Sequence, residues 1–242
     1  MKTIGVLGGM SWESSLEWYR LANERVRDRL GGYHSARVLL DSLDFAEIEA
    51  LQAAGDWGAT ARILSTRART LQDAGADLIV LCTNTMHIVA GDIEAAIDIP
   101  FLHIADTTAD AIAAAGLHTV GLLGTAFTME QPFYRDRLAS RGIRALVPDE
   151  EDRRTVHDII YGELVHGVVT DTSRGRYRDV MARLHDAGAE GVILGCTEIE
   201  LLVSPADSPV PVFPTTALHV DAAVAFALAA ADGPGGVTFR RR

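Results

Sequence analysis

The sequence has few of the residues that define several common classes of protein. Only two of its 242 residues are cysteines, and it has neither a Cys-x-x-Cys pair nor a cysteine–histidine cluster with metal-ligand spacing. No window offers the roughly 18 apolar residues that a membrane-spanning helix needs. Neither a Gly-x-Gly-x-x-Gly loop nor a Walker motif is present, which argues against a nucleotide site. We therefore expect neither a metal centre nor a membrane span.

Positive charge is also in the minority. Lysine and arginine number 22 against 33 acidic residues, which gives a net charge of −11, and the only basic run is at residues 240–242. Such a chain is a poor candidate for binding nucleic acid through its phosphates. The N-terminal stretch has one lysine and a short apolar run that ends in glycines, which indicates a buried strand rather than a signal peptide. The composition thus predicts a soluble cytoplasmic protein.

Apolar runs that suit strands alternate with amphipathic stretches that suit helices. Continuous Val/Ile/Leu strands separated by helices predict the α/β class with parallel sheets. The expected strands are residues 3–8, 37–41, 77–82, 101–104, 119–124, 143–147, 191–195 and 212–213. The expected helices are residues 12–30, 57–74, 130–141, 155–167, 174–187 and 216–231.

The two halves of the chain resemble each other. TIGVLG at 3–8 matches TVGLLG at 119–124, and AGADLIVLCT at 74–83 matches AGAEGVILGCT at 187–197. Two matched motifs in the same order predict two similar Rossmann-like domains, related by a pseudo-twofold axis, with the active site in the cleft between them. The predicted boundaries are 1–105 plus 210–232 for the first domain, 106–209 for the second, and 233–242 for a flexible tail.

Cys82 and Cys196 occupy equivalent places in the two halves, each at the end of a predicted strand and the start of a predicted helix. A helix N-terminus lowers the pKa of a thiol and favours the thiolate. Free cysteines are often inert core residues, and Thr83, Asn84 and Thr197 are natural helix caps. Neither property explains a cysteine at the same place in both halves. A two-base proton exchange does, because it needs one acid–base group on each face of a carbon.

Four motifs carry a resemblance to a known family. They are GGMSWES at 8–14, CTNTMH at 82–87, GLLGTAFTM at 121–129 and GCTEI at 195–199. In these motifs the sequence resembles the aspartate/glutamate racemase family of cofactor-independent, two-cysteine amino-acid racemases. It is most similar to the broad-specificity amino-acid racemase subgroup, and the resemblance covers about residues 1–230.

The resemblance implies that Cys82 and Cys196 are catalytic and that neither pyridoxal phosphate nor a metal takes part. It also implies a homodimer. The substrate-binding residues that it implies are Met10, Gln52 in a loop at 45–52, Thr83, Asn84 and Thr85 around the α-carboxylate, Thr197 opposite them, and Thr125 and Thr128 in the second half.

The segment 42–52 departs from the family's aspartate-selective members, which tend to carry a basic residue there, because it holds three acids and no base. Racemisation is therefore better supported than aspartate as the substrate, and a hydroxylated side chain such as that of homoserine stays open. A decarboxylase or isomerase of small carboxylates and a non-catalytic amino-acid sensor are the alternative functions. His87 and Glu198 either tune the neighbouring thiols or only stabilise the fold.

Overall fold

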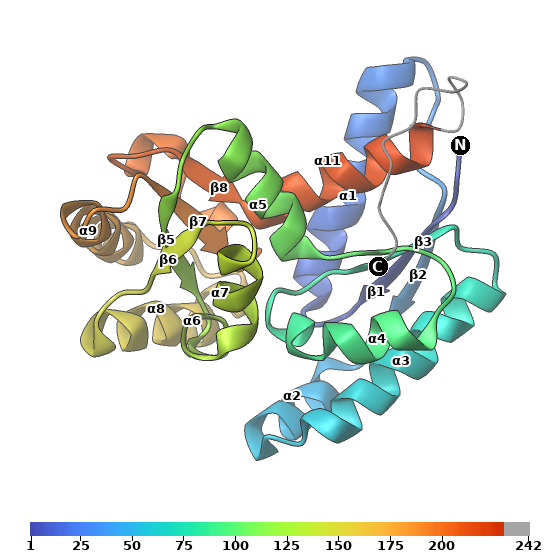
Figure 1. Cartoon of the computed structure of the whole chain (residues 1–242), viewed down its shortest axis with the longest axis horizontal. Coiled ribbons are helices and arrows are strands. Elements are labelled where there is room, and N and C mark those ends of the chain that lie inside the picture. Colours follow the sequence, from blue (N-terminus) through green and yellow to red (C-terminus); the bar gives the residue numbers. More distant parts are fainter. Residues whose placement is uncertain (230–242) are drawn as a thin grey trace. The chain divides into compact units, whose positions relative to one another are not determined.

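The computed structural model describes residues 1–229, which form two compact units (Figure 1). Unit 1 comprises Met1–Cys82, Val89–Leu102 and residues 219–229, and unit 2 comprises Thr83–Ile88 and His103–Leu218. Each unit contains one sheet of four parallel strands. The predicted α/β class with parallel sheets is therefore confirmed, while the predicted tail at 233–242 lies outside the described residues.

The sheet of unit 1 has the strand order β2-β1-β3-β4. Its strands are β1 (Ile4–Gly8), β2 (Val38–Ser42), β3 (Leu78–Leu81) and β4 (Phe101–Leu102). Its helices are α1 (Trp12–Leu30), α2 (Phe45–Ala54), α3 (Trp57–Asp73), α4 (Ala90–Ala96) and most of α11 (Thr215–Leu228). Helices α1 and α3 cover opposite faces of the sheet, since a Cβ on Gly8 would meet Ser15 and one on Gly5 would meet Leu71. All residues of β1 and β3 are buried, as expected for parallel strands covered on both faces.

The turn between β1 and α1 requires a glycine. Gly9 has a φ of 85°, and a Cβ there would lie 2.2 Å from the backbone oxygen of Leu43. The side chain of Ser11 then accepts a hydrogen bond from the backbone N–H of Ser14 and caps α1. The glycine pair at the end of the first strand thus lets two backbone segments approach each other at the edge of the sheet.

The sheet of unit 2 has the order β6-β5-β7-β8, which repeats the strand order of unit 1. Its strands are β5 (Thr119–Gly124), β6 (Arg144–Leu146), β7 (Gly191–Gly195) and β8 (Val212–Pro214). Its helices are α5 (Ile104–Ala114), α6 (Ala126–Glu130), α7 (Pro132–Ala139), α8 (Glu150–Gly162), α9 (Asp171–Asp186) and α10 (Ile199–Leu202). Short 3₁₀ helices are η1 (Thr85–Val89), η2 (Leu164–His166) and η3 (Pro205–Asp207). The shared strand order supports the internal duplication that the matched motifs predict.

Alternate residues of β5 and β7 enter two separate cores in unit 2. Leu123 and Val192 pack with residues of α8 and α9, including Tyr177. Leu122 and Ile193 pack with residues of α5 and α7 on the other face. Burial of apolar side chains on both faces explains why these strands consist of continuous hydrophobic runs.

At α2 and α8 the structure differs from the sequence-based expectation because of caps that the hydrophobic pattern does not include. Residues 45–52, expected as a loop, belong to helix α2, so that expectation is wrong. Asp44 caps α2 by accepting from the backbone N–H of Ala46, and Gly55 ends the helix in the left-handed conformation. Helix α8 begins five residues before the expected start at 155, because Asp149 accepts from the backbone N–H of Asp152.

The two units also differ from the predicted domain boundaries at three segments. Residues 83–88, 103–105 and 210–218 belong to unit 2, whereas the sequence assigns all three to the first domain. Strand β8 pairs with β7 through Val212, Phe213 and Pro214, which explains the difference at 210–218. The side chains of Asn84 and Thr85 hydrogen-bond to residues of unit 2, which explains the difference at 83–88.

The buried His219 makes the stability of unit 1 depend on pH. Its Nε2 donates to the backbone oxygen of Leu102 at 2.8 Å, and burial lowers its pKa to about 4. In the unfolded chain histidine has a pKa of about 6.5, so the unfolded state binds the proton more tightly between these two values. We expect the free energy of unfolding to fall by about 3 kcal/mol as the pH drops through this window.

Denaturant unfolding of His219→Gln at about pH 7 and at about pH 5 checks this expectation. The glutamine amide can still donate to Leu102, and it does not titrate, so the variant should lose most of the pH dependence. The exposed His34→Gln variant is the control and should keep it. The same pH dependence in His219→Gln as in the wild type would contradict the assignment.

Candidate active site

The candidate site residues follow strands at the carboxyl ends of the two sheets. In unit 1, Met10 follows β1 and Cys82 directly follows β3. In unit 2, Thr125 follows β5, Cys196 follows β7 and Thr215 follows β8. Because the carboxyl ends of parallel strands lie along one edge, these side chains gather at the ligand-binding edge of their own sheet.

Cys82 is a free, buried cysteine at the end of β3. Its backbone N–H donates to the oxygen of Leu7 at 2.9 Å, which continues the pairing of β3 with β1. Burial raises the pKa of its thiol. The lowered pKa expected from a helix N-terminus is therefore wrong in this state, because burial disfavours the thiolate and the chain continues into the short 3₁₀ helix η1 rather than an α-helix.

Cys196 is a free, half-buried cysteine at the end of β7. Its Sγ donates a hydrogen bond to Oε2 of Glu198 at 3.0 Å. Burial raises the pKa of this thiol, and the negative charge of Glu198 raises it further. Helix α10 begins nearby but is only four residues long, so its dipole cannot offset these two effects. Of the two interpretations of Glu198, the structure favours a direct effect on the thiol.

Three buried threonine hydroxyls meet in unit 2. Oγ1 of Thr85 lies 3.0 Å from Oγ1 of Thr125 and 3.4 Å from Oγ1 of Thr128, and the latter two are 3.3 Å apart. Thr125 also caps α6 by accepting from the backbone N–H of Thr128. The structure thus brings together three predicted substrate-binding residues from two distant parts of the sequence. Hydroxyl groups can rotate to donate hydrogen bonds to an anion such as a carboxylate.

The other predicted contacts of unit 2 are Thr83, Asn84 and Thr197. Asn84 is buried and donates from Nδ2 to Oγ1 of Thr215 at 3.0 Å. Thr83 is half-buried, and its backbone oxygen accepts from Nδ1 of His87 at 2.7 Å. Thr197 is buried immediately after Cys196.

His87 holds the backbone of this segment. While its Nδ1 faces the oxygen of Thr83, its Nε2 accepts from the backbone N–H of Ile104 at 3.2 Å. These two contacts require the neutral imidazole with its proton on Nδ1. The geometry therefore favours the structural interpretation of His87.

Met10 and Gln52 are the predicted substrate contacts in unit 1. Met10 is buried in the turn after β1, and Gln52 is buried in the last turn of α2 rather than in a loop. Sequence reasoning missed Thr215, which is fully buried and directly follows β8. The rule that ligand-binding residues follow parallel strands could have identified it.

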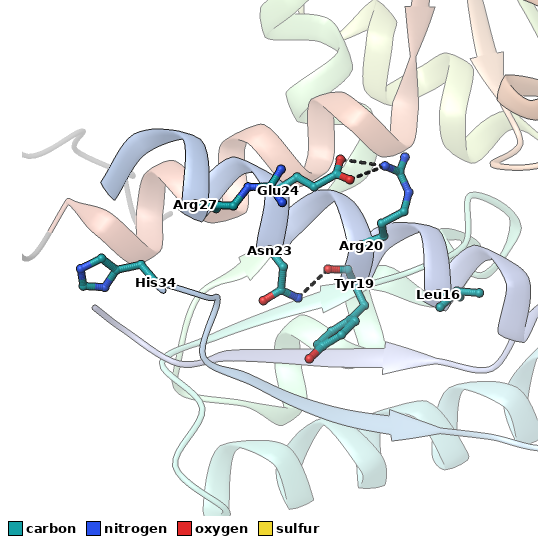
Figure 2. A pocket seen from close by; sticks show the side chains of 7 residues that line it. All are labelled: Leu16, Tyr19, Arg20, Asn23, Glu24, Arg27 and His34. Carbon is teal, nitrogen blue, oxygen red and sulfur yellow. Dashed lines mark hydrogen bonds and ion pairs between the residues drawn. The ribbon is translucent and has the colours of Figure 1, made fainter. Parts of the chain in front are cut away.

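A hollow of about 470 Å³ lies on α1 of unit 1 (Figure 2). It is lined by Leu16, Tyr19, Arg20, Asn23, Glu24, Arg27 and His34. Arg20, one of these residues, forms ion pairs with Glu17 and Glu24 at 2.6 and 2.7 Å. None of the predicted site residues lines this hollow, so it is separate from the carboxyl ends of the strands.

Among residues 1–229, no group of three or more His, Cys, Asp or Glu side chains is placed to hold a metal ion. Within the same residues, no helix has the length and hydropathy to cross a membrane.

The chain is thus a duplicated α/β protein with one cysteine after the third strand of each unit. It belongs to the Asp/Glu/hydantoin racemase family, whose sequence model matches residues 7–223. A candidate Asp/Glu racemase from Yersinia pestis has a similar structure with 54% sequence identity and a TM-score of 0.89, covering 94% of this chain and all of the other.

Two archaeal structures are also similar. An aspartate racemase homologue from Pyrococcus horikoshii OT3 is 33% identical with a TM-score of 0.82, covering 94% of this chain and 99% of the other. The aspartate racemase of Picrophilus torridus is 19% identical with a TM-score of 0.73, covering 93% of each chain, and this likeness shows the fold alone.

The contact between Glu198 and Cys196 predicts how this thiol titrates. Removing the carboxylate charge in Glu198→Gln should lower the pKa of Cys196, because a neighbouring negative charge disfavours the thiolate. The ultraviolet absorbance of the thiolate, followed against pH in a Cys82→Ser background, reports this pKa. Glu200→Gln is the matched control and should lower the pKa less, since its charge contributes less. An unchanged pKa in Glu198→Gln would mean that the carboxylate does not act on the sulfur.

Proposed function

We propose that the protein is an amino-acid racemase that needs no pyridoxal phosphate and moves the α-proton by two-base transfer between Cys82 and Cys196. The observation that carries the proposal is the equivalent placement of two free cysteines. Each directly follows the third strand of its own sheet, at the edge where α/β folds bind ligands. Membership of a racemase family supports the same reaction class.

In this mechanism the thiolate of one cysteine removes the α-proton from one face of the substrate. The electron pair of the broken C–H bond stays on the α-carbon and spreads into the carboxylate. The thiol of the other cysteine then donates its proton to the opposite face, which inverts the configuration. At the end the first cysteine is a thiol and the second a thiolate, so the two roles are exchanged for the reverse reaction.

The raised pKa values of both thiols fit a site that acts only when substrate is bound. In the empty protein, burial keeps Cys82 and Cys196 in the neutral form. The α-ammonium group of a bound amino acid brings a positive charge, and a positive charge near sulfur lowers the pKa of a thiol. Formation of the basic thiolate would therefore be coupled to substrate binding.

The hydroxyl cluster of unit 2 supports a role in holding the substrate carboxylate. We assign this role to Thr85, Thr125 and Thr128, and we keep Thr83 and, on the opposite side, Thr197 as further proposed contacts. Hydroxyl and backbone N–H donors aimed at the carboxylate stabilise the negative charge that develops there. Met10 and Gln52 are proposed to contact the substrate from unit 1.

We propose a substrate range that is broader than aspartate. The segment 42–52 offers three acidic side chains and no basic one, so it gives no ion pair for a side-chain carboxylate. Acidic amino acids therefore have to be compared directly with neutral and hydroxylated ones, homoserine included.

Proton NMR in deuterium oxide, together with chiral chromatography, tests the reaction on L- and D-amino acids. The wild type should exchange the α-proton and invert the stereocentre without added cofactor. Cys82→Ser and Cys196→Ser should each lower racemisation by about 100-fold or more, because the serine hydroxyl is a far weaker acid–base group. One single variant should still exchange the α-proton of one enantiomer.

Circular dichroism should show that both serine variants stay folded. Full racemisation by either variant would refute the two-base mechanism. An absence of exchange across acidic, neutral and hydroxylated amino acids, with folded protein and reduced thiols, would refute the racemase assignment.

We also infer that the chain forms a homodimer through α1 and its neighbours. Large hydrophobic side chains are exposed in this part of unit 1: Trp12, Leu16, Tyr19 and Leu30 on α1, Tyr33 after it, and Leu40 on β2. Exposed apolar patches of this kind mark interaction sites.

The charges of α1 favour a second copy as the partner. Residues 12–19 carry two acidic side chains and no basic one, whereas residues 20–30 carry four basic and two acidic ones. An antiparallel pair of α1 helices, related by a twofold axis, places the acidic half of each helix against the basic half of the other. A partner of a single charge sign would match only one of the two halves.

Leu16→Glu should shift the protein from dimer to monomer, because it places a charge between the exposed side chains of Trp12 and Tyr19 on α1. Sedimentation velocity measures the change. Leu201→Glu on unit 2 is the matched control, since Leu201 is 48% exposed and Leu16 is 56% exposed. A Leu16→Glu variant that stays dimeric would place the interface elsewhere, and a monomeric wild type would refute the dimer.

A further inference from the structure

The side-chain amide of Asn84 takes part in a short chain of hydrogen bonds within unit 2. Its Nδ2 lies 3.0 Å from Oγ1 of Thr215. That hydroxyl lies 2.9 Å from the backbone oxygen of Leu194 in strand β7. Both side chains are buried, with 4% of Asn84 and none of Thr215 exposed.

The direction of these bonds fixes the orientation of the amide. The oxygen of Leu194 can only accept, so the single proton of the Thr215 hydroxyl points toward it. The hydroxyl therefore has to accept from Asn84, and only the NH₂ group of the amide can donate. The orientation with Oδ1 toward Thr215 would place two acceptors face to face. Thr215 thus distinguishes the two ends of an amide that are otherwise nearly the same in shape.

As a result, Oδ1 of Asn84 is turned away from Thr215. This oxygen is buried and has no hydrogen-bond partner among the described residues. A buried acceptor without a donor costs about 1–3 kcal/mol. Because Asn84 is two residues after Cys82, a bound ligand with an N–H group can supply the missing donor.

We propose that Thr215 is a positioning residue that holds the Asn84 amide so that Oδ1 accepts a hydrogen bond from the α-ammonium group of the substrate. The inference rests on the proposed amino-acid substrate and refines it. It changes the expected role of Asn84, because a carboxylate has no proton to donate to Oδ1. A carboxylate ligand could accept only from the second N–H of Nδ2, and it would leave Oδ1 without a donor.

The experiment compares an amino acid with its analogue that lacks the amino group. Calorimetric titration of the full-length protein with L-aspartate and with succinate measures the two dissociation constants. Wild type should bind L-aspartate more tightly than succinate. In Thr215→Val, which keeps the shape but loses the hydroxyl, L-aspartate should bind about tenfold more weakly, while succinate binding stays unchanged.

Two further variants keep the test decisive. Thr215→Ser retains the hydroxyl and should bind both ligands as the wild type does. Asn84→Leu removes Oδ1 and leaves Thr215 unchanged, so it tests the same contact if Thr215→Val does not fold. It should show the same selective loss of L-aspartate binding. An equal loss of both ligands, or no loss of either, would overturn the positioning role, as would equal affinity of the wild type for both ligands.

The same titrations separate this inference from the proposed reaction. Selective loss of L-aspartate binding, in a wild-type protein that exchanges no α-proton, would support the ammonium contact while the racemase assignment fails. Racemisation in a protein whose variants lose both ligands equally would support the reaction and overturn the role of Thr215.

Discussion

The parallel pairing of β5 with β7 determines the arrangement of the site residues in unit 2. At the last pair of this ladder Gly124 lies opposite Gly195. The two strands are so close there that a Cβ on Gly195 would lie 2.6 Å from the backbone oxygen of Leu123. The next residues in the two chains are Thr125 and Cys196. A larger residue at either glycine would push the strands apart and move the threonine hydroxyls and the thiol away from each other.

Burial, rather than helix dipoles, governs the chemistry of the two thiols. Only a short helix follows each cysteine, namely η1 after Cys82 and α10 after Cys196. Burial around the sulfur atoms favours the neutral thiol over the thiolate. Glu198 strengthens this preference at Cys196 alone. The two thiols are therefore equivalent in topology but different in electrostatics.

Much of the fold could be predicted from the sequence, because strands that are buried on both faces leave a strong hydrophobic signal. All eight expected strands occur, and 119–124 and 191–195 have the expected bounds. Helix α2 was missed because its start depends on one cap at Asp44. The sequence placed both cysteines at strand ends, but not the bond from Cys196 to Glu198 or the link from Asn84 to Thr215, because these depend on side-chain rotamers and on contacts across 131 residues.

The division of the chain between the units has a consequence for synthesis. Unit 1 needs residues 219–229, which are synthesised after unit 2. In the folded protein His219 hydrogen-bonds to the backbone oxygen of Leu102, and Asp221 accepts a hydrogen bond from Arg25. Unit 2 needs Thr83–Ile88, which leave the ribosome before any of its strands. Neither unit can be completed from one uninterrupted stretch. A nascent chain therefore has to hold the first sheet, whose four strands end at Leu102, without α11 until that helix emerges.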